Sequence, residues 1–220
     1  MLIQVAQKAL KRLQINDLST VKNISLLFLT EIIDKCLIFL MSIAITRYLG
    51  PELYGRHAFS VNFALLFATV ADLGMSAYAT REVAKDQKNA QAYISNIAAV
   101  KLILAVIVMI LSYGGAFILQ KPVETQVYVI IAAIYVVTNS FSELFRSVFR
   151  ACDVIKYVMA SRLTQSICLV LFIGIVTQYT ATGITGILIA YVLAEVIGLL
   201  VAVTVTKGNI TPSRLSWDKP

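Results

Sequence analysis

The chain is dominated by long apolar stretches that are separated by short polar or turn-forming breaks. Of its 220 residues, 59% are hydrophobic and only 14% are charged, whereas a soluble domain is about 25% charged. A helix that crosses a bilayer needs about 20 mostly apolar residues. We therefore predict an all-α fold, a polytopic membrane helix bundle of about six transmembrane helices, at residues 24–46, 57–79, 94–119, 127–149, 157–179 and 182–206.

Five breaks separate these six spans, and three regions are predicted along the chain. The breaks lie at Gly50-Pro51, Arg81 to Lys88, Lys121-Pro122, Arg150 to Lys156 and Gln178 to Gly183. Residues 1–22 are basic, with apolar side chains at helical spacing, and they form either an amphipathic helix on the cytosolic membrane surface or a frayed cytosolic tail. Residues 23–206 form the transmembrane lobe, and residues 207–220 form a polar cytosolic linker.

The lysine and arginine residues predict the orientation of the chain in the membrane. With the N-terminus inside, 14 of the 19 basic residues lie on or near the cytosolic side, and only Arg47, Arg56 and Lys121 lie outside. This bias indicates an N-in, C-in protein of the cytoplasmic membrane with both termini cytosolic. The net charge of +7 is thus explained by topology rather than by a nucleic-acid partner.

The residue types found in metal and catalytic sites are sparse. Cys36, Cys152 and Cys168 form no CxxC pair, and His57 is the only histidine. The loops are short, and the chain has no phosphate-binding loop. We predict no disulfide, no metal site, no cofactor and no enzymatic activity.

Three charged residues share one face of the first span. Asp34 and Lys35 lie three and four residues after Glu31. Lys35 lies about 16 Å into the span. Charges at that depth each cost on the order of 3 kcal/mol unless they face water or other helices. We therefore predict that they line a polar cavity, or alternatively that Glu31 and Lys35 form a self-neutralising structural pair.

A polar stripe runs along the fourth span towards the cytosol. Asn139, Glu143, Arg146 and Arg150 are spaced by four, three and four residues. They are candidate cavity residues, although the two arginines also fit a role as interfacial anchors.

Single polar residues occur in the remaining spans. Asn62 and Lys101 are further cavity candidates, and the long Lys101 side chain alternatively reaches the inner interface. Asp72 suits a gate or a helix cap. Glu195 is a lone carboxylate near mid-membrane; with Asp34 it is a candidate for a coupling ion, or it bonds a neighbouring helix. Such groups in most spans are typical of a transport pathway, and the cations Lys35, Arg146 and Lys101 suit an anionic head group such as pyrophosphate.

Two motifs resemble those of a known family. The segment R-Y-L-G-P-E-L-Y-G from Arg47 to Gly55 resembles the R-Y-L-G-P-x-x-Y/F-G signature of Wzx-like polysaccharide flippases, in the multidrug/oligosaccharidyl-lipid/polysaccharide exporter superfamily. The segments A-D-L-G at 71–74 and T-R-E-V-A at 80–84 resemble its D-L-G and R-E-x-A pattern. Gly50-Pro51 should stop the first helix, and Gly55 should permit a tight re-entry. The predicted gate or architectural residues are Arg47, Gly50, Pro51, Gly55, Asp72 and Arg81.

The resemblance implies one lobe of a two-lobe exporter that works by alternating access. Its implied substrate is a polyprenyl-pyrophosphate-linked oligosaccharide, and its implied partners are membrane lipids and a second lobe, either in cis or as another copy. We expect the chain to be an N-terminal fragment of such a protein rather than a natural homodimer. The alternatives are a drug/cation antiporter or a peptidoglycan-precursor flippase of the same superfamily and, in a different class, a polytopic membrane glycosyltransferase.

Overall fold

The computed structural model describes residues 2–179 and 182–209, and within these ranges the chain is helical and contains no strand. The elements are α1 (Leu2–Leu66), α2 (Ala68–Asp72), α3 (Met75–Lys85), a 3₁₀ turn (Gln87–Asn89), α4 (Ala90–Ile118), α5 (Val123–Ala151), α6 (Ile155–Tyr179) and α7 (Gly183–Asn209). The prediction of an all-α membrane helix bundle is confirmed.

The turns between the long helices fall at the predicted breaks. Gln120 and Asp153 take left-handed conformations, with φ of 48° and 56°, in the connections before α5 and α6. Pro122 precedes α5 in an extended conformation, where its missing N–H costs no helical hydrogen bond. Gly183 begins α7 at φ 60°, a value that glycine adopts without steric cost.

The second predicted span, 57–79, is wrong as a single helix, because the structure divides it between α1, α2 and α3. The helix is interrupted at Phe67 and again at Leu73-Gly74, where both residues have positive φ. Gly50 is also non-helical, with φ 71° and ψ 173°, so α1 bends there as the glycine-proline pair predicts. Apolar composition alone does not reveal such breaks, because the residues on both sides remain hydrophobic.

Four helical segments are long and apolar enough to cross a membrane, judged over the described part of the chain: Gln87–Ile118, Val123–Ala151, Ile155–Tyr179 and Gly183–Thr206. The predicted first span carries the charges Glu31, Asp34 and Lys35, and the second is broken as described above. The total of six spans and the N-in, C-in orientation therefore stay predictions.

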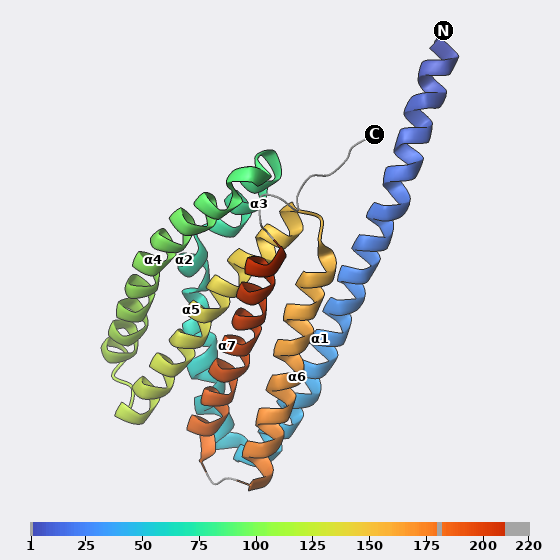
Figure 1. The fold of residues 1–220 in the computed structure, drawn as a ribbon. Coiled ribbons are helices and arrows are strands. Elements are labelled where there is room, and N and C mark those ends of the chain that lie inside the picture. Colours follow the sequence, from blue (N-terminus) through green and yellow to red (C-terminus); the bar gives the residue numbers. More distant parts are fainter. Residues whose placement is uncertain (1, 180–181, 210–220) are drawn as a thin grey trace.

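The bundle packs around α5 and α7, with α4 on one side and α1 and α6 on the other (Figure 1). The main core contains buried Ile45 of α1, Ala132 and Ala133 of α5, and Ile187 and Leu188 of α7. Small residues let membrane helices approach closely. The remaining core lies where α3, α4 and α5 meet and where α5, α6 and α7 meet.

The two ends of the described chain lie at the same end of the bundle, and the first part of α1 extends beyond it (Figure 1). Residues 2–22 are helical, but they continue directly into the predicted first span instead of forming a separate helix. Most of the predicted cytosolic linker, residues 210–220, lies outside the described residues.

Candidate functional site

A cavity of about 330 Å³ lies between α1, α5, α6 and α7. Its lining combines charged, amide, aromatic and aliphatic side chains, which are Glu31, Asp34, Lys35, Leu37, Ile38, Met41, Val61, Leu65, Tyr135, Asn139, Glu143, Arg146, Arg162, Gln165, Ser166, Leu169 and Tyr191. Three of the lining residues are acidic and three are basic. The formal charges that line the cavity therefore sum to zero.

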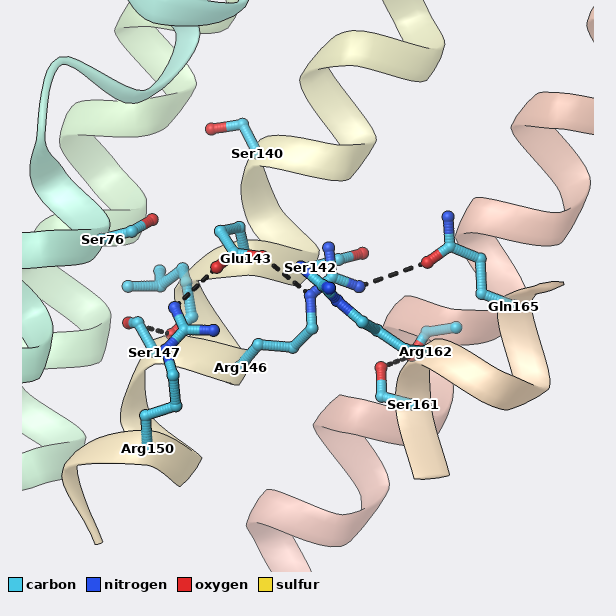
Figure 2. A network of polar contacts seen from close by, with 12 residues as sticks. Ser76, Ser140, Ser142, Glu143, Arg146, Ser147, Arg150, Ser161, Arg162 and Gln165 are labelled. Atoms are coloured by element: carbon cyan, nitrogen blue, oxygen red, sulfur yellow. Dashed lines mark hydrogen bonds and ion pairs between the residues drawn. The ribbon is translucent and has the colours of Figure 1, made fainter. Parts of the chain in front are cut away.

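Arg146 of α5 is the centre of a polar network that joins α5 to α6 (Figure 2) and also reaches Glu195 of α7. Its Nε donates to Glu143 Oε2 at 2.9 Å, and its Nη1 donates to Gln165 Oε1 of α6 at 3.3 Å. Arg150 Nη2 binds the other oxygen of Glu143 at 2.6 Å. The side chain of Arg146 is only 3% exposed, so this residue is mostly engaged by protein groups.

Glu195 of α7 belongs to the same network, which corrects the prediction of a lone carboxylate. It is fully buried, and one of its oxygens accepts a hydrogen bond from Gln165 Nε2. The other oxygen lies 3.9 Å from Arg146 Nη2 and has no hydrogen-bond partner within the described chain. A buried carboxylate requires such compensation, because transfer of an unpaired charge out of water costs several kcal/mol.

The charged residues of α1 differ from the alternative prediction, in which Glu31 pairs with Lys35. Glu31 instead accepts a hydrogen bond from Arg162 of α6 at 2.9 Å, and Asp34 accepts one from Ser166 Oγ. Lys35 lines the cavity and is exposed, and it forms no ion pair with the residues that the structure describes. It is thus the cavity cation with the most freedom to meet a ligand.

The cavity contains six of the nine predicted cavity residues: Glu31, Asp34, Lys35, Asn139, Glu143 and Arg146. Arg150 lies behind Glu143, and Asn62 is exposed and donates to the carbonyl of Ala58 in its own helix at 2.8 Å. The cavity also contains Arg162, Gln165, Ser166, Tyr135 and Tyr191, which were not among the predicted site residues. Polar spacing on α6 is a signal for the first three, whereas tyrosines in an apolar helix carry none.

Lys101 is placed differently from both predictions made for it. It is buried and lies away from the cavity, where its Nζ binds Asp72 Oδ1 at 2.5 Å. It also donates to the carbonyl and hydroxyl oxygens of Ser140 at 2.8 and 2.6 Å. Asp72 in turn accepts hydrogen bonds from Ser76 at the start of α3. This second polar cluster joins α4 and α5 to the break between α2 and α3.

The glycine-proline motif residues lie at the bend of α1. Tyr48 accepts a hydrogen bond from the backbone N–H of Gly183 at 3.3 Å, which ties the motif to the start of α7, and Arg47 is exposed. Pro51 begins the helical segment that follows Gly50. The tight re-entry predicted at Gly55 is wrong, because Gly55 is helical and has no positive φ.

The T-R-E-V-A segment of the second motif lies on α3, beyond the predicted second span, whereas its A-D-L-G segment lies at the end of α2 and the break that follows. Arg81 Nε and Lys85 Nζ both lie 3.0 Å from Glu82 Oε1. The hydrogen bond from Lys85, with a smaller contribution from Arg81, holds the pKa of Glu82 below its usual value. Arg81 and Lys85 are largely exposed, so the contribution of these ion pairs to stability is small.

No group of three His, Cys, Asp or Glu side chains is arranged to hold a metal ion within the part of the chain that the structure describes. The two polar features of the bundle described above are the mixed-charge cavity and the separate Lys101–Asp72 cluster. Both are held by side chains from several helices, as in a bundle whose polar groups are shielded from lipid.

These features define a polytopic α-helical membrane protein with a polar cavity between its helices. A family model described as "Polysaccharide biosynthesis protein" matches residues 20–215, which is most of the chain. The chain belongs to this family, that of the Wzx-like polysaccharide flippases and exporters, and the predicted family is confirmed. Comparisons with curated proteins and with solved structures found no match.

Membership of this family supports a role as a polysaccharide flippase or exporter in polysaccharide biosynthesis. Members of the family are transporters and flippases rather than enzymes. The apolar helices and the family together indicate a membrane protein.

Proposed function

We propose that this chain moves a polyprenyl-pyrophosphate-linked oligosaccharide across the cytoplasmic membrane by alternating access. The observation that carries this proposal is the mixed-charge cavity between α1, α5, α6 and α7, in which Lys35 has no ion-pair partner among the described residues. A free ammonium group beside a cavity of about 330 Å³ suits an anionic phosphate group.

The other cavity cations are better placed to shape the site than to bind a phosphate directly. Arg146 is already engaged by Glu143 and Gln165, and Arg162 is engaged by Glu31. A ligand phosphate at Lys35 would compete only with water, whereas one at Arg146 would have to displace two protein partners. We therefore assign direct phosphate contact to Lys35, and a supporting role to Arg146.

Two further elements belong to the proposal. Glu31 and Lys35 are exposed on α1 beside apolar side chains such as Ile38, and a charged surface of this kind is costly to leave against lipid. We propose that a second lobe, in cis or from another copy, covers it. The lysine and arginine bias supports a cytosolic position for both termini, and Asp34 and Glu195 stay candidates for a coupling ion.

The proposal can be tested by complementation in a deletion strain of the source organism. Lys35→Ala should reduce surface polysaccharide strongly at normal membrane abundance, because it removes the phosphate contact. Lys88→Ala, at an exposed lysine outside the cavity, is the matched control and should complement fully. Full complementation by Lys35→Ala would contradict the proposed phosphate contact.

A direct measurement uses the purified protein in proteoliposomes that contain a fluorescent polyprenyl-diphosphate glycolipid. The wild type should accelerate loss of the inner-leaflet signal relative to protein-free vesicles, and a neutral analogue without the diphosphate should not respond. Equal movement of both lipids would contradict selection of an anionic head group.

A further inference from the structure

The lining of the cavity combines two chemically different sets of side chains. One set is charged and includes Lys35, Glu143 and Arg162, whereas the other consists of Tyr135 and Tyr191 together with aliphatic side chains. On α5, Tyr135 precedes Glu143 by eight residues, which corresponds to about 12 Å along a helix. Tyr191 precedes Glu195 of the Arg146 network by one turn of α7. The two sets of side chains can therefore contact different parts of one extended head group.

The two tyrosines form a rigid aromatic corner. Their ring centroids are 5.6 Å apart with an interplanar angle of 60°, which is an edge-to-face arrangement. His57, which is 5% exposed, stacks against Tyr191 with centroids 6.0 Å apart and rings 26° from parallel. Tyr54 packs against His57 at the same centroid distance. This backing layer fixes the orientation of Tyr191 before any ligand arrives.

The tyrosine hydroxyl groups and the neighbouring amide are available to a ligand. Both tyrosines are partly buried and line the cavity, and neither hydroxyl forms a hydrogen bond with another described residue. Asn139 lines the cavity one turn after Tyr135, and its amide offers both donors and an acceptor. Met41 and Val61 provide apolar contacts nearby.

This combination matches the chemistry of a sugar ring. A pyranose presents one face of C–H groups and a rim of hydroxyl groups, so it packs on an aromatic ring and hydrogen-bonds at its edge. Tyrosine supplies an apolar ring with a polar end. A polyprenyl chain needs only apolar surface, and it gains nothing from unpaired hydroxyl and amide groups. We infer that Tyr135 and Tyr191 form the binding surface for the first sugar of the lipid-linked substrate, while Lys35 holds its diphosphate.

This inference rests on the proposed function, and a binding experiment separates the two. The purified chain in detergent is titrated with farnesyl diphosphate and with farnesyl diphosphates that carry one glucose or one N-acetylglucosamine. The wild type should bind at least one glycosylated carrier about tenfold more tightly than the bare carrier, as expected for a well-stacked ring. Tyr135→Leu and Tyr191→Leu should remove this preference and leave the affinity for the bare carrier unchanged.

Two variants serve as controls. Lys35→Met should weaken the binding of all carriers, because it removes the diphosphate contact. Tyr113→Leu changes an exposed tyrosine of α4 outside the cavity and should alter nothing. Equal affinity of the wild type for bare and glycosylated carriers, or an equal loss for both in the tyrosine variants, would overturn the sugar surface. Binding of no carrier by the wild type would instead contradict the proposed function.

A second measurement uses the wild-type protein and is independent of the folding of the leucine variants. Tyrosine iodination is followed by peptide mass spectrometry with and without each carrier. The glycosylated carrier should protect Tyr135 and Tyr191 more strongly than farnesyl diphosphate does, whereas Tyr113 should react equally in all samples. Equal protection by the two carriers would contradict the inference.

Discussion

Lys101 Nζ lies 2.5 Å from Asp72 Oδ1, and this ion pair joins α4 to the last residue of α2. The same ammonium group donates to two oxygens of Ser140 on α5. The helix is broken immediately after Asp72, at Leu73-Gly74. One buried side chain thus holds a discontinuous segment against two continuous helices, and broken helices are the elements that move in many transporters.

We predict that Lys101→Met destabilises the protein strongly. The Lys101 side chain is fully buried and Asp72 is 30% exposed, so the variant leaves a poorly solvated carboxylate without its cation. Loss of one partner of a buried pair costs about 3–5 kcal/mol. The melting temperature in detergent should therefore fall, and the double variant Lys101→Met/Asp72→Asn should recover part of the loss. Lys85→Met, at a lysine that is 62% exposed, is the control. Equal melting temperatures for the two lysine variants would contradict a stabilising role for the pair of Lys101 and Asp72.

Arg146 supports a similar prediction within the cavity network. It is the cation closest to the fully buried Glu195, at 3.9 Å. Arg146→Met should cost about 3–5 kcal/mol because Glu195 then remains buried without a counter-charge. The double variant Arg146→Met/Glu195→Gln should be more stable than the single one.

The matched control for this prediction is Arg162→Met. Arg162 is 27% exposed and its partner Glu31 is half exposed, so solvent screens their pair and the change should stay within about 1 kcal/mol. Chemical denaturation followed by far-UV circular dichroism compares the free energies of unfolding of these variants. If the double variant is no more stable than Arg146→Met alone, Glu195 does not depend on Arg146.

Much of the fold is predictable from the sequence, because a bilayer span requires a long apolar run and the chain contains several. The turns at Lys121-Pro122 and near Gly183 follow from residues that stop or start helices. The breaks at Phe67 and Leu73 are not predictable in this way, because they occur within an apolar run. A buried lysine of another helix, Lys101, binds Asp72 directly before the break at Leu73.

The candidate site is predictable only along each helix. Spacing of three and four residues correctly places Glu31, Asp34 and Lys35 on the cavity side of α1. It cannot identify Arg162 as the partner of Glu31, because the two are 131 residues apart in the chain. Tyr135 and Tyr191 were missed because a tyrosine within an apolar helix has the same pattern whether it faces lipid, core or cavity.

The orientation of α4 in the membrane is open to a direct test. The charge bias places Lys88, before α4, in the cytosol and Val123, after it, outside. In a background with the three cysteines replaced by serine, Val123→Cys should react with a membrane-impermeant maleimide on intact cells. Lys88→Cys should react only after permeabilisation, which also serves as the control for side-chain access. Both positions are exposed. The reverse pattern would contradict the N-in orientation.

The two glycines of the R-Y-L-G-P-E-L-Y-G motif should respond in opposite ways to alanine. Gly50 has φ 71° and ψ 173°, a region that is essentially restricted to glycine, so Gly50→Ala should cost about 1–3 kcal/mol. Gly55 lies in a helix, and a Cβ there meets no atom within 4 Å. Gly55→Ala should therefore be neutral or stabilise by up to about 1 kcal/mol, because alanine favours the helix.

Thermal unfolding of the two variants in one detergent tests whether backbone conformation, rather than membership of the motif alone, decides the effect of alanine at each glycine. A lower melting temperature for Gly50→Ala and an unchanged or higher one for Gly55→Ala is expected. Because Tyr48 binds the backbone of Gly183, a shifted bend at Gly50 should also loosen the start of α7, which hydrogen exchange would detect as faster exchange there. If Gly55→Ala is as damaging as Gly50→Ala, Gly55 has a role in contacts outside the described chain, such as those with a second lobe.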